Sequence, residues 1–521
     1  MTKSETKNTA DSGQTPSTAE TRRTPSMFAS LLTLGVMVVL ILLSVALFGG
    51  TVADGPLQVS MTLATLFALS VAYYYNFRGS VISQAIADGV NGTIGTIFVI
   101  LAIGTVIGTL YLSGSVAAFV YYGSAILSPR FFFVTVFILA SILSRLLGSS
   151  LTTVGAVGIA FVGLASIMGV SPAIAAGAAV SGAIFGNKVA PISDTANLTV
   201  ASVGGLTIRE HAKVVTRTAI PTWILSAVMF LVLGFLGTSQ AAPVDIDQVQ
   251  STIGQYYNIS LLAFTPVILI FVLSMLRFSA FMSLMLSAIY AVILATFTQP
   301  DLIVAAANDP GLSYLGAAFK VSINTLGNGF SLGSGVDELD TLFSGGGAVS
   351  MLTTVWLVLV AASFGAVTGY TGMLQRIITP VINWTKGPAS LILATMLTSI
   401  GMNLATADPY TSVVLTSKMF RQEYIKERLK PVLLTTGMAD SGTIVSHIIP
   451  WNLHGAVFAG TLGIATLQWA PYTFFAYLTP VVTFVMVYVY YMRRDRLADD
   501  QDAEQVYGAE PSQLPEPTQL A

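Results

Sequence analysis

Residues 185–198 read FGNKVAPISDTANL, and this stretch decides the fold. Lys188 and Asp194 stand here, directly after a run of small apolar residues that ends at Phe185. A charged side chain at membrane depth costs about 2.5–3.5 kcal/mol on insertion scales and marks an ion or proton path. The Gly, Pro, Ser and Asn of the same stretch interrupt a helix, which a membrane tolerates only where the freed backbone lines a cavity or is buried in protein. The stretch therefore predicts a broken membrane helix.

The rest of the chain has the composition of a membrane protein. Of its 521 residues, 54% are hydrophobic and 9% are charged, whereas an ordinary soluble domain has about 25% charged residues. A run of about 20 apolar residues crosses a hydrocarbon layer about 30 Å thick. Strong spans are predicted near residues 28–48, 57–76, 94–112, 131–147, 172–186, 219–237, 259–276, 278–298, 349–375 and 471–492. Because the chain between 388 and 470 is apolar but repeatedly broken, we expect an all-α polytopic protein with about 10–12 transmembrane helices.

Basic residues in the short loops predict the orientation. They precede the first span, cluster in later loops, and follow the last span, at Arg22, Arg23, Arg209, Lys213, Arg217, Lys418–Lys430, Arg493, Arg494 and Arg496. We expect both termini to be cytoplasmic in a bacterial inner membrane, with the first span retained rather than cleaved as a signal peptide.

Composition also predicts five regions along the chain. They are a disordered cytoplasmic tail (1–26), an N-terminal membrane repeat (27–240), linking spans with a polar Gly-rich loop (241–347), a C-terminal membrane repeat (348–492), and an acidic disordered cytoplasmic tail (493–521). The third region should contain an amphipathic surface helix from Tyr314 to Thr325.

Two further aspartates stand in broken apolar sequence. Asp408 lies in GMNLATADPYT (401–411) and Asp440 lies in ADSGT (439–443). Both stretches mix Gly or Pro with side-chain oxygens, as do the discontinuous helices whose freed carbonyls and hydroxyls coordinate Na⁺ in transporters. The alternative is that these stretches are extramembrane loops, in which such residues are routine.

The two halves of the chain resemble each other weakly. GSSLTT (148–153) precedes Pro191, and GMNLAT (401–406) precedes Pro450 at a similar spacing. Interrupted helices at matching places in two repeats point to a transporter site between them. A chance match is the alternative, because Gly, Ser, Thr and Leu are common throughout.

These residues together resemble the NhaC-type Na⁺/H⁺ antiporters. Residues 185–198 are similar to that family's Gly-Asp-Lys-x-Ser-Pro-Leu-Ser-Asp-Thr-Thr-Asn-Leu signature, and 440–443 with 449–452 to its Glu-Asp-Ser-Gly-Thr and Ile-Pro-Trp-Asn elements. Residues 403–408 fit its Asn-x-x-Thr-x-Asp stretch. The resemblance implies the ion transporter superfamily, with two inverted repeats, a moving transport domain and a homodimer. It also implies re-entrant hairpins with tips near Asn403–Asp408 and at Ser149, Ser150 and Thr152.

The chain departs from the family pattern at four positions. Asn187 and Ala439 stand where the family usually has acids, and His447 and Pro409 replace a usual Pro and Gln. With two fewer carboxylates the substrate could differ. The alternative function is therefore a Na⁺/H⁺-coupled organic-anion exchanger of the malate/lactate type, or an amino-acid transporter of the same fold.

The expected mechanism is exchange of Na⁺ for H⁺ at buried carboxylates. Desolvation favours the protonated form of a carboxyl group, whereas Na⁺ or a lysine favours the ionised form, so the two ions compete. We expect Asp194 and Asp440 to carry this competition, with Lys188 and Asn187 as charge partners. The further ion-binding candidates are Ser193, Asn197, Asn403, Thr406, Asp408, Ser441 and Thr443. No cofactor is expected beyond the transported ion; the expected partners are Na⁺, H⁺ and the lipid bilayer, without nucleic acid.

Three histidines and one hydrolase-like motif complete the candidates. His447 and His454 could sense pH, since a histidine titrates near neutrality, although packing is the commoner role; His211, among charged neighbours, is expected in a loop. Residues 329–333 match Gly-x-Ser-x-Gly but lack the strand and helix that a hydrolase needs around it. No P-loop occurs, so an ion gradient must drive transport; a passive channel stays an alternative and an enzyme is not expected.

Overall fold

The computed structural model describes residues 24–237, 246–335, 337–487 and 506–507. The predicted tails, 1–26 and 493–521, therefore lie almost entirely outside the described residues. Within the described ranges the chain is helical, and the sole β-type pairing is an isolated bridge between Phe330 and Gly345. In this part of the chain, nine helices are long and apolar enough to cross a membrane, or up to 12 if each bent pair counts as one span. The expected all-α polytopic fold is confirmed.

The unbroken apolar runs became helices close to their predicted bounds. These helices are α1 (Met27–Phe48), α2 (Pro56–Tyr74), α4 (Ile94–Leu112), α6 (Phe132–Leu147), α13 (Thr265–Met275), α14 (Ala280–Thr298), α18 (Leu352–Tyr370) and α26 (Phe474–Met486). Local signals fix their ends: the Ser26 side chain accepts a hydrogen bond from Ala29 N at the start of α1, and Pro56 occupies the first turn of α2, where a missing N–H costs nothing.

The sequence-based prediction misplaced or missed three helices. α11 (Ile208–Gly237) begins well before the predicted start at residue 219, because its first turns carry Arg209, Glu210, Lys213 and Arg217. The apolar run Ser150–Ile167 is a further candidate span, built from α7 (Ser150–Thr153), the π-helical η3 (Val154–Gly158) and α8 (Ile159–Ile167). α20 (Pro388–Thr406) is another. Their mean hydropathies, 1.8 and 1.4, are no lower than the 1.4 of the predicted span Pro56–Tyr74, so it was the Gly, Ser and Thr residues within them that made the sequence look broken.

The same order of elements occurs twice. α6 and α20 each end in a residue with positive φ, Gly148 (φ 68°) and Ala407 (φ 55°). The next residue in each case caps the following helix: Ser149 accepts from Thr152 N, and Asp408 accepts from Thr411 N. The helices that follow are α7 to α8 in the first half and α21 (Pro409–Lys426) in the second.

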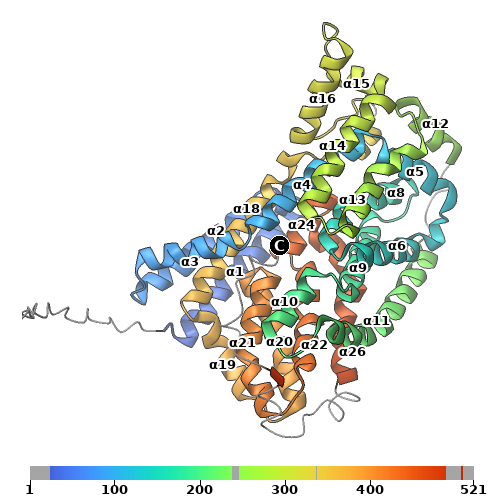
Figure 1. Ribbon diagram of the computed structural model, residues 1–521. Coiled ribbons are helices and arrows are strands. Elements are labelled where there is room, and N and C mark those ends of the chain that lie inside the picture. The colour runs from blue at the N-terminus through green and yellow to red at the C-terminus, as the bar shows by residue number, and fades with distance from the viewer. Residues whose placement is uncertain (1–23, 238–245, 336, 488–505, 508–521) are drawn as a thin grey trace, which may run out of the picture.

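Each half then contains a broken helix. α9 (Pro172–Val189) and α10 (Asp194–Val203) meet at 45°, and the segment Pro431–Ile448 meets α24 (Leu453–Leu462) at 41°. The second segment itself contains α22 (Pro431–Ala439) and α23 (Gly442–Val445). The breaks lie at Pro191 and Pro450, as the sequence predicts. Figure 1 shows α9, α10, α22 and α24 together in the interior of the helical body.

Glycines set the closest helix contacts. A Cβ at Gly186 would lie 2.5 Å from Ser141 O of α6, and one at Gly365 would lie 2.8 Å from Thr406 O of α20, whereas nothing lies within 4 Å of that position at Gly369. Small residues let helix backbones approach in this way. α6 and α9 therefore pack backbone to backbone. The turn from α6 into α7, at Gly148 and Ser149, is called the first turn region below, and it forms one unit with the first broken helix.

The remaining helices surround this interior. They are α3 (Gly79–Asn91), α5 (Ser115–Ile126), α12 (Ile246–Tyr256), α15 (Pro300–Ala307), α16 (Tyr314–Asn328), α17 (Asp337–Leu342), α19 (Met373–Asn383) and α25 (Thr466–Trp469). α16 contains the predicted amphipathic helix and exposes Leu315, Phe319 and Ile323 along one stripe. The Gly-x-Ser-x-Gly residues follow it in irregular backbone and not between a strand and a helix.

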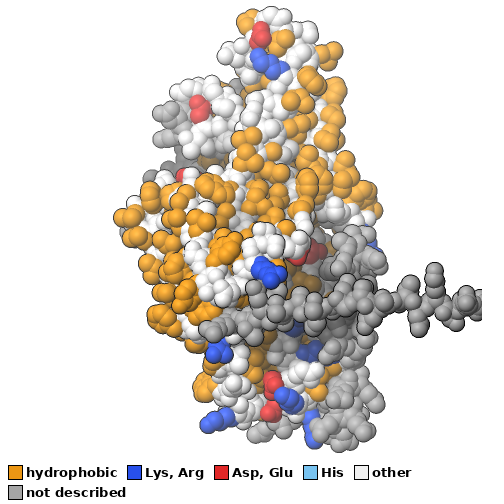
Figure 2. All heavy atoms as spheres, turned by 90° about the vertical axis from the view of Figure 1, so that its left-hand side faces the viewer, with side chains coloured by type: hydrophobic (Ala, Val, Ile, Leu, Met, Phe, Trp, Pro, Cys, Tyr) orange, Lys and Arg blue, Asp and Glu red, His pale blue; other side chains and the backbone are white. Residues whose placement is uncertain are grey.

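The two ends of the molecule differ in charge. α15 and α16 project at one end, and α19, α21 and α22 form the other (Figure 1). On the face shown in Figure 2, most of the visible Lys and Arg side chains gather toward the second end, below a broad hydrophobic surface. This second end is called the basic end below.

Candidate ion-binding site

Lys188 and Asp440 form an ion pair where the two broken helices meet. The Lys188 Nζ atom lies 2.8 Å from Asp440 Oδ1, and the two side chains are 2% and 0% exposed. Lys188 stands in the last turn of α9, where a positive charge is stabilised by the helix dipole. Asp440 is the C-cap of α22, where a negative charge is disfavoured. The carboxylate therefore depends on partners from other elements.

Two threonine hydroxyls supply the remaining partners of this carboxylate. Thr218 of α11 donates to Asp440 Oδ2 at 2.7 Å, and Thr483 of α26 donates to the same oxygen at 2.6 Å. All three side chains are buried. Hydrogen bonds to an ionised acceptor are about twice as strong as neutral ones, so this arrangement holds Asp440 as a carboxylate in a dry interior.

The local sequence explains why the chain breaks beside both charges. Pro191 stops α9, and Ser193 begins α10 by accepting a hydrogen bond from Ala196 N at 3.3 Å. On the other side, Gly442 follows Ser441 directly after Asp440. A Cβ at Gly442 would lie 2.5 Å from Ser399 O of α20, so only glycine allows the interruption between α22 and α23, which precedes the break at Pro450, to pack there.

Asp194 is in α10 and Asp440 caps the end of α22, and their shared role in ion exchange stays a prediction. Asp194 is the first residue of α10 and its side chain is exposed, as is that of Asn197. Among the described residues, no hydrogen bond or ion pair joins Asp194 to Asp440. Asp194 and Asp408 instead both lie near enough to Tyr410 to act on it electrostatically. Sequence spacing could not show this, because the break between α9 and α10 changes which way each side chain faces.

Asn403, Thr406 and Asp408 hold the turn between α20 and α21. Asn403 Nδ2 donates to Ser412 Oγ at 2.8 Å, and Asn452 Nδ2 donates to Asn403 Oδ1 at 3.2 Å. Thr406 Oγ1 donates to Met402 O at 2.8 Å, and Asp408 Oδ2 accepts from Thr411 N at 2.7 Å. These predicted ligands thus connect α20, α21 and the second break in the present structure.

The interruption between α22 and α23 contains Ser441 and is followed by Thr443. The first turn region lies near the segment that follows. Ser441 Oγ donates to Gly437 O at 2.6 Å, and Thr443 is buried beside it. Ser150 Oγ lies 3.1 Å from His447 Nε2 and so joins the first turn region to that segment. The other predicted tip residues, Ser149 and Thr152, bond to each other at 3.0 Å.

His447 and His454 are stacked. Their ring centroids lie 4.2 Å apart with an interplanar angle of 13°. Ser446 Oγ lies 3.3 Å from Nδ1 of His447 and 3.1 Å from Nδ1 of His454. The pair packs the break tightly, and its predicted pH-sensing role stays a prediction.

A small cavity of about 20 Å³ adjoins the ion pair. It is lined by Ile184, Asn187, Lys188, Thr195, Ala196, Thr199, His211, Ala439, Thr443, Ile444 and His447. A space of roughly 10–15 Å³ holds one water molecule if polar partners are present. Asn187 Oδ1 is buried without a hydrogen-bond partner, so the cavity has both the volume and an acceptor for one small polar guest.

His211 is not in a loop, contrary to the expectation. It stands in the first turn of α11 and is 1% exposed. Sequence reasoning also missed Thr218 and Thr483, which carry no local signal. Helical spacing could have found His211: with α11 begun at Ile208, positions 211, 215, 218 and 222 share one face, and all four side chains are buried.

Comparison with known proteins identifies the family. A model of the Na⁺/H⁺ antiporter family matches residues 1–238 and 198–490. The Na⁺/H⁺ antiporter NhaC of Alkalihalophilus pseudofirmus is 31% identical, over 88% of this chain and 95% of its own. The chain belongs to the Na⁺/H⁺ antiporter family. The NhaC of Bacillus subtilis is 29% identical over 83% of this chain and 92% of its own, and the malate-2H⁺/Na⁺-lactate antiporter of the same organism is 26% identical over 87% and 92%.

Three of the four departures from the NhaC-type pattern, Asn187, Ala439 and His447, line one cavity in this antiporter-family fold. Asn187 and Ala439, which stand where that pattern usually has acids, both line the 20 Å³ cavity beside Lys188. In this chain Asp440 therefore faces Lys188 without the two acids that the family usually has at positions 187 and 439.

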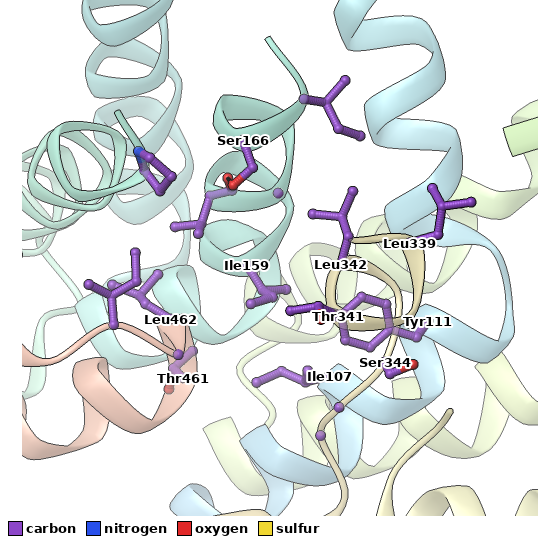
Figure 3. Close-up of a pocket in the computed structure, with 18 of the residues that line it drawn as sticks. Ile107, Tyr111, Ile159, Ser166, Leu339, Thr341, Leu342, Ser344, Thr461 and Leu462 are labelled. Atoms are coloured by element: carbon purple, nitrogen blue, oxygen red, sulfur yellow. Dashed lines mark hydrogen bonds between the residues drawn. The ribbon is translucent and has the colours of Figure 1, made fainter. Parts of the chain in front are cut away.

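A second, much larger cavity lies on the side of α8 and α12. It has a volume of about 1210 Å³, and Figure 3 shows Ile107, Tyr111, Ile159 and Ser166 among the side chains around it. The described residues that line it include no Lys, Arg, His, Asp or Glu. The described lining residues therefore offer an ion no formal charge.

The donor atoms around Asp440 suit a hard monovalent cation. No group of three or more His, Asp or Glu side chains within the described residues could hold a metal ion, and a resident transition metal has no ligand set there. One carboxylate with the hydroxyls of Thr218 and Thr483 instead offers oxygen ligands, which hard cations prefer. A Na⁺ ion at these oxygens would be cargo and not a resident cofactor.

Proposed function

We propose that this multi-pass membrane protein exchanges Na⁺ for H⁺ and that the Lys188–Asp440 pair is the exchange site. The observation that carries the proposal is the ion pair itself, 2.8 Å long and almost fully buried, at the junction of two broken helices. Membership of the Na⁺/H⁺ antiporter family supports it. An ionisable pair in this position is expensive, and marks an ion or proton path.

Exchange follows from competition for one carboxylate. In the observed state the Lys188 ammonium neutralises Asp440 and leaves no second cation position at Oδ1. When Lys188 gives up its proton, Asp440 loses its counterion in a dry interior, which is costly, and Na⁺ restores neutrality. When Na⁺ departs, a proton must return to Lys188. Na⁺ and H⁺ therefore occupy the site alternately, which is the condition for antiport.

The two threonines adapt the carboxylate to either partner. In the observed state Thr218 and Thr483 donate to Oδ2 and leave Oδ1 to the ammonium. A hydroxyl also has two acceptor lone pairs, so both oxygens can turn toward a cation without moving the helices. With them, Na⁺ gains ligands from α11, α22 and α26 at once.

The orientation and assembly belong to the same proposal. The gathering of Lys and Arg at the basic end supports a cytoplasmic location for that end by the positive-inside rule, with both termini there, in a bacterial cytoplasmic membrane. We also propose that the protein forms a homodimer, because its sequence resembles the ion transporter superfamily.

The organic-anion alternative receives less support. The relative named a malate-2H⁺/Na⁺-lactate antiporter is 26% identical, but a dicarboxylate needs basic side chains, and the described lining of the 1210 Å³ cavity has none. Arg145 near the end of α6 is a basic side chain that could attract an anion, but it is exposed.

Transport measurements in membrane vesicles test the proposal. Na⁺-dependent proton flux is measured in everted vesicles for the wild type, Asp440→Asn and the matched control Asp88→Asn, whose carboxylate is exposed on α3. We expect loss of exchange in the first variant and full exchange in the second. Full activity of Asp440→Asn would refute the site. Counterflow in proteoliposomes with Na⁺, Li⁺, K⁺, malate and lactate then identifies the substrate.

A further inference from the structure

A cavity of about 470 Å³ lies between the first two spans and the second break. Its walls include η1 (Gly49–Asp54), α2, α18 and α24, and Figure 1 shows α2, α18 and α24 close together. Because η1 follows the far end of α1, it is one membrane crossing away from Met27. With both termini cytoplasmic, as proposed above, this cavity faces the outer side of the membrane, and it is called the outer cavity below.

The outer cavity has one formal charge. Asp54 is the single ionisable side chain among the described residues that line it. A cleft lined by one sign of charge, between walls of low dielectric constant, focuses the field and concentrates counterions. The 1210 Å³ cavity adjoins it, and its described lining adds no Lys, Arg, His, Asp or Glu. The lining of the two cavities therefore favours cations over anions. The residues that they share are Ser350, Gly460, Gly463 and Ile464.

Gln58 provides an oxygen in the wall of the outer cavity that has no partner. Its side chain is 1% exposed, and its Nε2 donates to Ala53 O at 2.7 Å and to Thr353 O at 3.0 Å. These two bonds use both amide protons and hold the side chain between η1 and α18. The Oε1 atom is buried and accepts no hydrogen bond from the described residues. A buried acceptor without a donor is costly, and a cation in the cavity would satisfy it.

A threonine hydroxyl adds a second neutral oxygen. Thr354 lies in the first turn of α18 and lines the outer cavity. A Cβ at Gly460 of α24 would lie 2.6 Å from Thr354 Oγ1, so the glycine leaves space beside this hydroxyl. Carboxylate, amide and hydroxyl oxygens are the ligands that hard cations prefer. Asp54, Gln58 and Thr354 thus bring one of each kind to a single cavity.

The outer cavity reaches the second break. Pro450 is among its lining residues, whereas His447, three residues earlier, lines the 20 Å³ cavity beside Lys188. The short segment 447–450 therefore separates the outer cavity from the small cavity at the ion pair. A cation in the outer cavity is thus close to the proposed exchange site without being in contact with it.

We propose that the outer cavity is a staging site, in which a hard monovalent cation waits before it reaches Asp440. Asp54 draws the ion in, and Gln58 Oε1 and Thr354 Oγ1 are its neutral ligands. This inference rests on the proposed exchange function and orientation, and it adds to them the site by which Na⁺ enters and leaves on the outer side. Because three side-chain oxygens do not complete the shell of a hard cation, the ion keeps part of its water here.

The test compares the two faces of the membrane. Uptake of labelled Na⁺ in exchange for internal protons is measured with the full chain in right-side-out and in everted vesicles, at an alkaline external pH where protons compete least. Asp54→Asn should raise the KM for Na⁺ about fivefold in right-side-out vesicles and by less than about twofold in everted ones, as expected for loss of one partly solvated charge at the outer face. Added choline chloride should reduce the difference between wild type and variant, because salt screens exposed charges.

Matched variants distinguish the staging site from a general defect. Asp301→Asn removes a carboxylate that is exposed on α15 and does not line the outer cavity, so both KM values should stay unchanged. Thr354→Val keeps the shape of the side chain and removes the hydroxyl, so it should raise the KM at the outer face alone. Thr368→Val is its control on the same helix, because this buried hydroxyl donates to Phe364 O and should not affect either KM.

Three results would overturn the staging site. The first is an unchanged KM in right-side-out vesicles for Asp54→Asn, and the second is a rise of equal or greater size in everted vesicles. The third is equal behaviour of Thr354→Val and Thr368→Val at the outer face. Absence of Na⁺/H⁺ exchange in the wild type would instead defeat the proposed function itself.

Discussion

The ammonium of Lys188 lies 2.8 Å from Asp440 Oδ1, the oxygen at which we propose that Na⁺ binds. The empty site is thus already neutral. Because the pair is dry, each partner is stabilised mainly by the other, and removal of one leaves an uncompensated charge. The stability of the protein and its ion exchange therefore depend on the same contact.

The first prediction concerns this dependence. Lys188→Met and Asp440→Leu should each lower the free energy of unfolding by about 3–5 kcal/mol, because each leaves a buried charge unpaired. The double variant should recover much of this loss, because it has no charge left to bury. Thermal unfolding in detergent measures all three. A double variant that is as unstable as the sum of the single ones would show that the two charges are not coupled.

The second prediction concerns the threonine hydroxyls. Thr483→Val removes a donor from Asp440 Oδ2 and a ligand from the proposed Na⁺ site, so the KM for Na⁺ should rise about 10- to 100-fold, as expected for a hydrogen bond to a charged group worth about 1.5–3 kcal/mol. Thr479→Val is the matched control, since this buried hydroxyl one turn earlier donates to Phe475 O. Equal KM values in the two variants would remove Thr483 from the site.

The third prediction concerns helix packing. Gly365→Ala should cost about 1–3 kcal/mol, the usual cost of overpacking, because its Cβ would lie 2.8 Å from Thr406 O. Gly369→Ala on the same helix has nothing within 4 Å and should be neutral or stabilising by up to about 1 kcal/mol, from helix propensity. Melting temperatures of the two variants provide the comparison, and the opposite order would contradict the close packing of α18 on α20.

The fourth prediction concerns the stacked histidines. Two positive rings about 4 Å apart repel by roughly 4 kcal/mol at an effective dielectric constant of 20, so the second protonation should open the 4.2 Å stack as the pH falls. If His447 and His454 sense pH, His454→Asn removes this repulsion and should extend exchange activity toward acid pH. The pH profile of Na⁺/H⁺ exchange is the measurement. If the exchange activity at acid pH is unchanged in this variant, the two histidines have only a packing role.

Much of the fold could be predicted from the sequence. Long apolar runs such as Met27–Phe48 match the thickness of a membrane, and Pro191 and Pro450 lie at the two breaks. Ser150–Ile167 could not be found in the same way. Its mean hydropathy of 1.8 is enough for a membrane span, but the glycines and hydroxyl residues of GSSLTTVGAVG (148–158) are typical of a break, and only the packing around them shows that the helix continues.

The site was predictable only in part. Lys188 and Asp440 are conspicuous as charges in apolar sequence, but their pairing depends on how α9 and α22 pack, which no local pattern contains. Asp194 is equally conspicuous in the sequence, yet the turn at the break leaves it exposed. Thr218 and Thr483 are ordinary helical threonines in the sequence, and only their distances to Asp440 reveal them.

The lysine beside Asp440 has a consequence for the membrane between turnovers. A transporter that waited with a naked anion in its interior would invite any passing cation, and each stray entry would dissipate the gradient that the cell maintains. Here the unloaded protein holds a cation tethered to its own backbone, so in the proposed exchange the barrier stays electrically tight until a sodium ion displaces it.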